Sequence, residues 1–183
     1  RPVGLAFAGR SFSSQRVLRR DGKYFATSFE EGVRVTDVRE KQILGTFRGS
    51  PGHNGTIAFL GSDRLAICSA RQILIWTIPK GELIQKVSLP EAHERTIAFS
   101  AGGRYAAMHG VEHGSRVIRI IDLSTGNDAG LLYGARGDSW ASTQAIAFSD
   151  DGLELAAVVG GHMMVWDLQT GEAIEDFDLG SNA

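Results

Sequence analysis

The sequence has little cysteine and little proline: one cysteine and four prolines occur among its 183 residues. The single cysteine, Cys68, cannot form a disulfide within the chain, so a disulfide-stabilised scaffold is excluded. No apolar run approaches the roughly 20 residues that a membrane-spanning helix needs, and no secretory signal is visible. We therefore expect a cytoplasmic location, no membrane partner, and a buried, unreactive Cys68.

The sequence also has little excess charge of either sign. Its 19 lysines and arginines stand against 21 aspartates and glutamates, for a net charge of -2. Proteins that grip nucleic acid through its backbone need a basic excess, so we expect no nucleic-acid partner. The hydrophobic share of 43% and the charged share of 22% are those of an ordinary globular chain with a packed core.

Glycine, by contrast, is abundant: its 23 residues, with so few prolines, indicate many tight turns, as in an all-β array. A short apolar motif occurs four times, as Thr56–Phe59, Thr96–Phe99, Ala145–Phe148 and, more weakly, Arg16–Arg19. A second motif follows each copy, as Val35–Val38, Ile75–Ile78, Ile120–Leu123 and Val165–Leu168. A turn and an apolar run separate the two motifs, and another turn and run follow the second. Each unit therefore predicts four short strands, here lettered a to d.

The spacing of these units predicts a β-propeller. The central residues of the first motif, Val17, Ile57, Ile97 and Ile146, are 40, 40 and 49 residues apart. Four-stranded units repeating every 40 to 45 residues are typical of propeller blades. We expect an all-β fold with blades at residues 15–55, 56–95, 96–143 and 144–183, and with the last strand of a preceding blade and its loop within residues 1–14.

The last unit resembles a WD40 repeat of the bacterial type. The resemblance is carried by Ile146–Gly152 and Val165–Glu172, and weaker copies extend it over nearly the whole chain. Tryptophan fills the family's tryptophan position only at Trp76 and Trp166. The resemblance implies a buried hydrogen-bond network in each blade, but only Gly52-His53 keeps the family's Gly-His pair before the first strand of a unit. We therefore expect apolar packing to hold the blades together.

Other polar positions of the repeat point to structure rather than chemistry. Thr36 and Ile121 replace the tryptophan in the first and third units. Asp37, Asp122 and Asp167 each end the second motif just before a turn, so we interpret them as turn residues.

Four blades do not close a ring of the usual seven or eight. The run Val3–Phe7 resembles a final strand, yet the last unit already contains one, and the chain begins at Arg1; both favour an arc cut from a longer array. The flanks of the end blades must then be covered. The alternatives are another protein or the remainder of the propeller, a second copy giving a homodimeric eight-bladed ring, or a strained four-bladed closure.

The third unit carries two insertions, which point to a binding face. We place the first in the b–c loop, at His109–Arg116, and the second in the d–a loop, at Gly134–Ser142. In an up-and-down blade both loops leave the same end, and binding concentrates in loops on a rigid scaffold. Trp140 is the candidate anchor, unless it folds over its own loop as a lid. The predicted partner-binding residues are Glu112, His113, Arg116, Arg136, Asp138, Trp140, His93 and Arg95.

Motifs for catalysis are lacking. The sequence has no Gly-x-Ser-x-Gly elbow and no phosphate-binding loop, and His109 and His113 have no third ligand nearby. We expect no enzyme activity, no metal and no cofactor. The favoured hypothesis is a protein-interaction scaffold; the resemblance implies a docking or sensing part of a larger multidomain protein. Two alternatives stay open: half of a propeller enzyme or small-molecule binder with its site on the ring axis, and a self-assembling half-ring.

Overall fold

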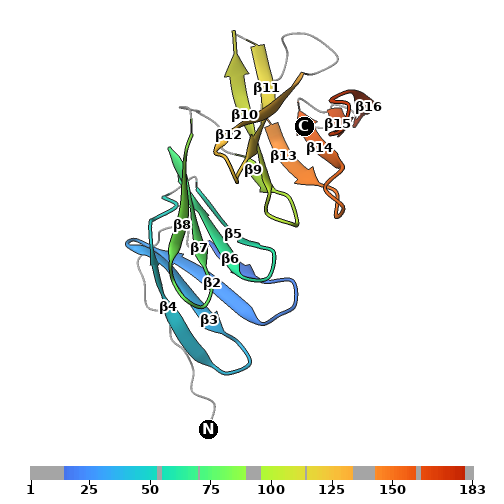
Figure 1. Cartoon of the computed structure of the whole chain (residues 1–183). Coiled ribbons are helices and arrows are strands. Elements are labelled where there is room, and N and C mark those ends of the chain that lie inside the picture. The colour runs from blue at the N-terminus through green and yellow to red at the C-terminus, as the bar shows by residue number, and fades with distance from the viewer. Residues whose placement is uncertain are drawn as a thin grey trace.

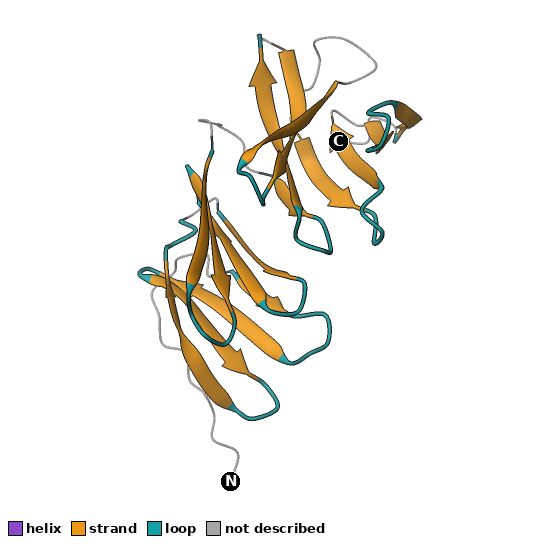
Figure 2. Cartoon of the chain, in the orientation of Figure 1, coloured by secondary structure: helices purple, strands orange, loops and turns teal. Residues whose placement is uncertain are grey.

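A computed structural model describes residues 15–52, 55–69, 71–89, 96–113, 115–133, 143–159 and 162–179. These residues form strands and turns, and none of them belongs to a helix (Figure 2). Accordingly, no helix of the described part is long and apolar enough to cross a membrane. The strand expected within residues 3–7 lies outside the described residues.

The strands form four antiparallel sheets of four consecutive strands each (Figure 1). Sheet 1 comprises β1 (Arg16–Leu18), β2 (Tyr24–Phe29), β3 (Gly32–Asp37) and β4 (Gln42–Arg48). Sheet 2 comprises β5 (Thr56–Leu60), β6 (Arg64–Cys68), β7 (Gln72–Thr77) and β8 (Leu83–Ser88). Sheet 3 comprises β9 (Ile97–Phe99), β10 (Tyr105–Glu112), β11 (Ser115–Asp122) and β12 (Asn127–Tyr133). Sheet 4 comprises β13 (Thr143–Phe148), β14 (Glu154–Val159), β15 (His162–Asp167) and β16 (Ala173–Asp178). The predicted all-β fold of four-stranded blades is confirmed.

Glycine and aspartate make the turns between these strands. Gly126, in the c–d turn of sheet 3, has φ 76, a left-handed conformation that glycine adopts without steric cost. In sheet 4, Asp167 Oδ1 accepts hydrogen bonds from the backbone N–H groups of Gln169 (2.7 Å) and Thr170 (3.0 Å). Asp37 and Asp122 bond to the following turn in the same way, so these three aspartates are turn residues as predicted.

The strand pairing corrects the alignment of the first unit by one residue. Leu18 pairs with Phe25, whereas in sheet 2 Phe59 pairs with Leu65, so Leu18 rather than Arg19 matches the last residue of Thr56–Phe59. The a–b turn of sheet 2 is one residue shorter than that of sheet 1. Matching the sequences at constant spacing therefore misplaced the weakest copy.

The core lies between consecutive sheets, in three apolar clusters. We call the face that a sheet turns toward the next sheet its leading face, and the opposite face its trailing face. Between sheets 1 and 2, the leading residues Tyr24, Ala26, Val33, Val35 and Phe47 pack on the trailing residues Ile57, Leu65, Ile67, Leu74 and Ile78. Between sheets 2 and 3, the cluster joins Leu60, Ala66, Cys68, Ile73, Ile75, Val87 and Leu89 to Ala106, Met108, Ile121 and Leu123. Between sheets 3 and 4, it joins Ala107, Ile118, Ile120 and Leu132 to Leu155, Ala157, Met164 and Trp166.

These clusters confirm that apolar packing joins the sheets and that Cys68 is buried. The two predicted tryptophans take part in different ways. Trp166 is fully buried, and its Nε1 donates to the carbonyl oxygen of Tyr133 in sheet 3 at 3.3 Å. Trp76 lies edge-on to Phe47 of sheet 1, with ring centroids 6.0 Å apart. Its buried Nε1 has no hydrogen-bond acceptor among the described residues.

Candidate functional site

The hairpin of β10 and β11 extends beyond the other sheets at the b–c end. Each of its strands has eight residues, whereas the b and c strands of the other sheets have five or six. Pairing continues through Val111 with Arg116 and Glu112 with Ser115. The prediction of a loop at His109–Arg116 is therefore wrong, because the inserted residues lengthen two paired strands. A two-residue turn suffices, since His113 adopts the left-handed conformation (φ 49) that tight hairpin turns require.

The tip of this hairpin presents both apolar and polar side chains. Val111 and His113 are exposed there, and His113 Nδ1 lies 3.6 Å from Glu112 Oε1. Tyr133, also exposed, ends β12 and pairs with Val117 beside the tip. The d–a connection thus leaves sheet 3 at the same end as the b–c turn, as the sequence predicted.

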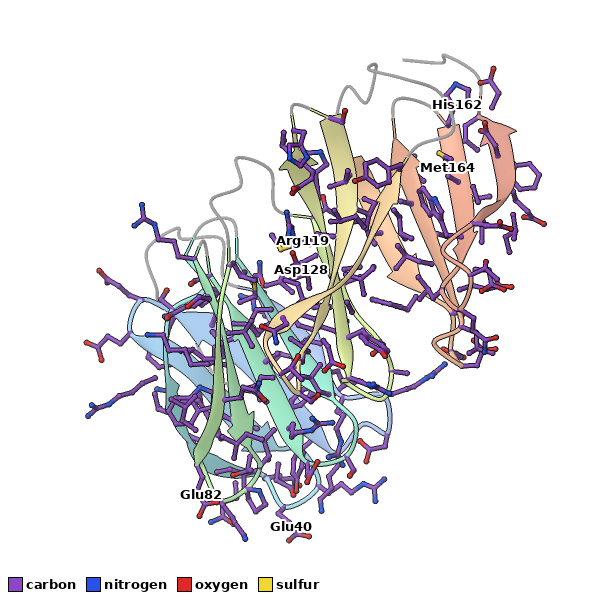
Figure 3. All side chains as sticks on the ribbon, turned by 45° about the horizontal axis from the view of Figure 1, so that its top comes forward. Glu40, Glu82, Arg119, Asp128, His162 and Met164 are labelled. Atoms are coloured by element: carbon purple, nitrogen blue, oxygen red, sulfur yellow. The ribbon has the colours of Figure 1, made fainter. Side chains whose placement is uncertain are left out.

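An ion cluster fixes the base of the hairpin. Arg119 donates through Nη2 to Glu112 Oε2 at 2.8 Å and through Nη1 to Asp128 Oδ2, so one guanidinium joins β10, β11 and β12 (Figure 3). Its side chain is 12% exposed. We call Val111, Glu112, His113 and Tyr133, with the Arg119–Asp128 pair beneath them, the hairpin surface.

Arg119 lies on the trailing face of sheet 3, at a position that is apolar in two other sheets. Strand pairing makes it equivalent to Leu74 of sheet 2 and Met164 of sheet 4, which both pack in the core. A buried arginine needs carboxylate partners to offset its loss of hydration. Glu112 and Asp128 supply these carboxylates, so the charge of Arg119 is paired within sheet 3 itself.

The resolved pKa shifts lie at the opposite end of the sheets. Hydrogen bonds from Ser124 lower the pKa of Asp122 below its ordinary value. Hydrogen bonding to Arg20 lowers the pKa of Asp150, whose carboxylate accepts from Arg20 Nη1 at 3.2 Å and Nη2 at 3.0 Å. A hydrogen bond from Ser149 likewise lowers the pKa of Asp151. These shifts arise from turn geometry and surface pairing. Within the described ranges, no group of three or more His, Cys, Asp and Glu side chains is arranged to hold a metal ion.

The predicted site residues fall into two groups. Glu112 and His113 lie together on the hairpin surface, and Arg116 lies in β11 next to them in the pairing. His109 is buried within β10, away from the exposed His113. The remaining predicted residues lie outside the described residues: His93, Arg95, Arg136, Asp138 and Trp140.

Sequence reasoning missed Val111, Arg119, Asp128 and Tyr133. The signal for Arg119 was present, since a charged residue interrupts an apolar strand where the matching motif reads Leu74 or Met164. The partners of Arg119 became visible only once the strands were paired, because Glu112 lies seven residues away across the hairpin turn.

Comparison with known proteins places the fold. No family model and no curated protein matches the sequence. Among 940 matching chains of solved structures is a chain in the crystal structure of the mitotic checkpoint complex. The match has a TM-score of 0.71 and 18% sequence identity, and it covers 93% of this chain and 53% of that one. The chain therefore has an all-β fold of propeller-type blades, and it spans about half the length of that chain.

Proposed function

We propose that the chain is a non-catalytic protein-interaction scaffold that binds a partner protein at the b–c and d–a end of its blades. The observation that carries the proposal is the projecting hairpin of sheet 3. Its two strands are fully paired, Arg119 ties them to β12, and Val111, His113 and Tyr133 are exposed around the tip. This is a rigid feature with an aromatic and an aliphatic side chain available for contact.

Such a surface is suited to protein recognition. Tyrosine and other large amphipathic side chains contribute most of the energy in many protein interfaces. A paired hairpin loses less conformational freedom on binding than a free loop, so more of its contact energy appears as affinity. The charged rim formed by Glu112 and Asp128 would favour a partner with basic groups facing it.

The inner strands support a binding role over an enzymatic one. Of the first strands of the four sheets, β5 and β9 carry no ionisable side chain, β13 reads Thr-Gln-Ala-Ile-Ala-Phe, and β1 carries Arg16 but no acid or metal ligand. An active site on the ring axis needs acids, bases or metal ligands on these strands. The proposed setting is a cytoplasmic, larger multidomain protein or complex of the bacterial WD40 type, in which this arc is the docking or sensing part.

The test is capture with matched variants. Purified chain is immobilised, and proteins retained from a lysate of its source cells are quantified by mass spectrometry and then confirmed with purified partner. The site variant combines Val111→Ala, His113→Ala and Tyr133→Ala. The control variant combines Glu40→Ala and Glu82→Ala, at the c–d end of sheets 1 and 2 (Figure 3).

The expected result is a partner whose Kd rises at least about 10-fold with the site variant, since hot-spot residues each contribute 1 kcal/mol or more, and stays constant with the control. A partner that binds all three proteins equally would refute the placement of the site. Turnover of a small molecule with no loss of rate in the site variant would refute the scaffold function itself.

A further inference from the structure

The leading face of sheet 4 and the trailing face of sheet 1 are the two ends of the row of sheets. They carry apolar residues equivalent to those packed between the sheets, but here these residues are exposed. Strand pairing makes Phe47, Val87, Leu132 and Phe177 equivalent on the d strands of the four sheets. The first three pack against the following sheet and are 3%, 2% and 4% exposed. Phe177, on the leading face of sheet 4, is 45% exposed.

The same contrast holds for the rest of this leading face. Ala26, Ala66 and Ala107 are fully buried on the b strands of the first three sheets, whereas the equivalent Ala156 is only half-buried. Val165 and Met163 of β15 are also half-buried, while their counterparts in sheets 1 to 3 are buried. In the described part of the chain, this apolar stripe is left without a covering sheet.

The trailing face of sheet 1 shows the complementary exposure. Val38 is 44% exposed, whereas its equivalents Ile78 and Leu123, which pack on the preceding sheet, are 5% and 1% exposed. Leu18, equivalent to Phe59, is likewise exposed. Sheet 1 thus presents the surface that sheets 2, 3 and 4 use to dock on their predecessors.

Charges on the a–b turns favour a match between these two faces. Between sheets 2 and 3, the first residue of the b strand reaches the next a–b turn, where Arg64 Nη2 donates to the carbonyl oxygen of Gly102 at 2.9 Å. In sheet 4 this strand position holds the exposed Glu154, and the a–b turn of sheet 1 carries Lys23, whereas Arg20 of that turn already pairs with Asp150 of sheet 4 in the same chain. A copy of sheet 1 following sheet 4 would therefore bring a basic side chain, Lys23, toward the acidic Glu154.

We propose that the chain pairs head to tail with a second copy of itself, the leading face of sheet 4 in each copy docking on the trailing face of sheet 1 in the other. Two such interfaces related by a twofold axis close a ring of eight sheets. Each interface brings together the same two faces as between sheets 1 and 2, 2 and 3, and 3 and 4, and Arg34, at the position of Leu74 and Met164, would lie within it. The opposite arrangement, with the two sheet 4 faces together, would place the acidic Glu154 and Asp151 against their own copies.

The test measures the mass of the full 183-residue chain by light scattering over a range of concentrations. Phe177→Asp alters the face of sheet 4, Val38→Asp alters that of sheet 1, and Ile84→Asp alters an equally exposed residue on sheet 2, in the middle of the arc. All three side chains are exposed in the single chain, so the variants should keep its circular dichroism spectrum.

We expect the unaltered chain and Ile84→Asp to have twice the 19.7 kDa mass of one chain. Each flank variant should raise the dimer Kd by roughly 100-fold or more, because its charge would be buried unpaired in an apolar interface. Mixing the two flank variants should recover part of the dimer, because one of its two interfaces is then unaltered while the other carries both substitutions.

Three results would overturn the proposal: a monomer at every concentration, a dimer that Phe177→Asp and Val38→Asp leave unchanged, or a dimer broken by only one of them. The first would mean that a different chain or further blades cover the flanks, and the last would indicate pairing of like faces. None of these outcomes touches the hairpin surface, so the scaffold function is tested separately.

Discussion

The two tryptophans that occupy the same position in sheets 2 and 4 should respond differently to the same substitution. Replacing either with phenylalanine keeps an aromatic ring and removes the indole N–H. At Trp166 that N–H donates to the carbonyl oxygen of Tyr133 across the interface between sheets 3 and 4. At Trp76 the buried N–H has no acceptor among the described residues.

The magnitude follows from what each N–H contributes. Removing the bond made by Trp166 costs about 0.5–1.5 kcal/mol, and removing the unpaired donor of Trp76 recovers part of a desolvation penalty of about 1–3 kcal/mol. The smaller ring also leaves a larger void at the fully buried Trp166 than at the half-buried Trp76, and this difference acts in the same direction. Trp166→Phe should therefore lower the free energy of unfolding by about 2 kcal/mol more than Trp76→Phe does.

Urea unfolding followed by far-ultraviolet circular dichroism measures the difference. Because stacked repeats can unfold in separate steps, amide hydrogen exchange in β7 and β15 should accompany it, reporting on each interface by itself. Equal losses for the two variants, or a greater loss for Trp76→Phe, would show that the cross-interface hydrogen bond does not stabilise the arc.

Three further predictions concern the hairpin, a glycine pair and a turn. Arg119→Met should change global stability by less than about 1 kcal/mol, because an apolar residue packs at this position in other sheets, but amides at the hairpin tip should exchange faster. Gly32→Ala should destabilise sheet 1 by about 2 kcal/mol or more, since its Cβ would clash with the backbone carbonyl oxygen of Phe47, whereas Gly45→Ala has open space and should be tolerated in urea unfolding. Ser124→Ala should raise the pKa of Asp122 toward 3.8, as NMR titration would show. A carboxylate whose pKa is lowered on folding stabilises the fold above that pKa and loses this contribution as the pH falls, so in the variant the loss should occur at a less acidic pH.

The repeat pattern predicted the fold well because each unit repeats the same order of apolar strands and turn residues. Apolar residues alternate along each strand, and glycine or an aspartate such as Asp167 marks each turn. This local pattern specifies four strands without reference to the rest of the chain. The alignment of Arg16–Arg19 failed because it assumed constant turn length, and one a–b turn is a residue shorter. Local patterns fix strands, whereas small differences in turn length are settled by the packing between sheets.

The candidate site was predicted only in part, for a related reason. Glu112 and His113 could be found from the extra residues in the third unit, but extra residues alone do not say whether they form a loop or lengthen a hairpin. The choice follows from the apolar alternation through Val111 and from a turn residue that tolerates positive φ. Exposed side chains such as Tyr133 belong to the site only because pairing brings them to the same end of the sheet.

The burial of Arg119 in sheet 3 depends on the length of the β10–β11 hairpin. Sheet 1 also has an arginine at the position of Arg119, namely Arg34, but its b strand ends at Phe29, two residues short of a counterpart to Glu112. Arg34 lies exposed, with its guanidinium carbon 5.4 Å from the Phe29 ring centroid, on the trailing face that no described sheet covers. Inside the arc the same charge needs carboxylates, and only a longer hairpin supplies Glu112. The extension that presents Val111 and His113 to a partner therefore also allows the charge of Arg119 to be buried between sheets 2 and 3. Shortening the hairpin to the length found in sheet 1 should weaken that interface and also remove the binding surface.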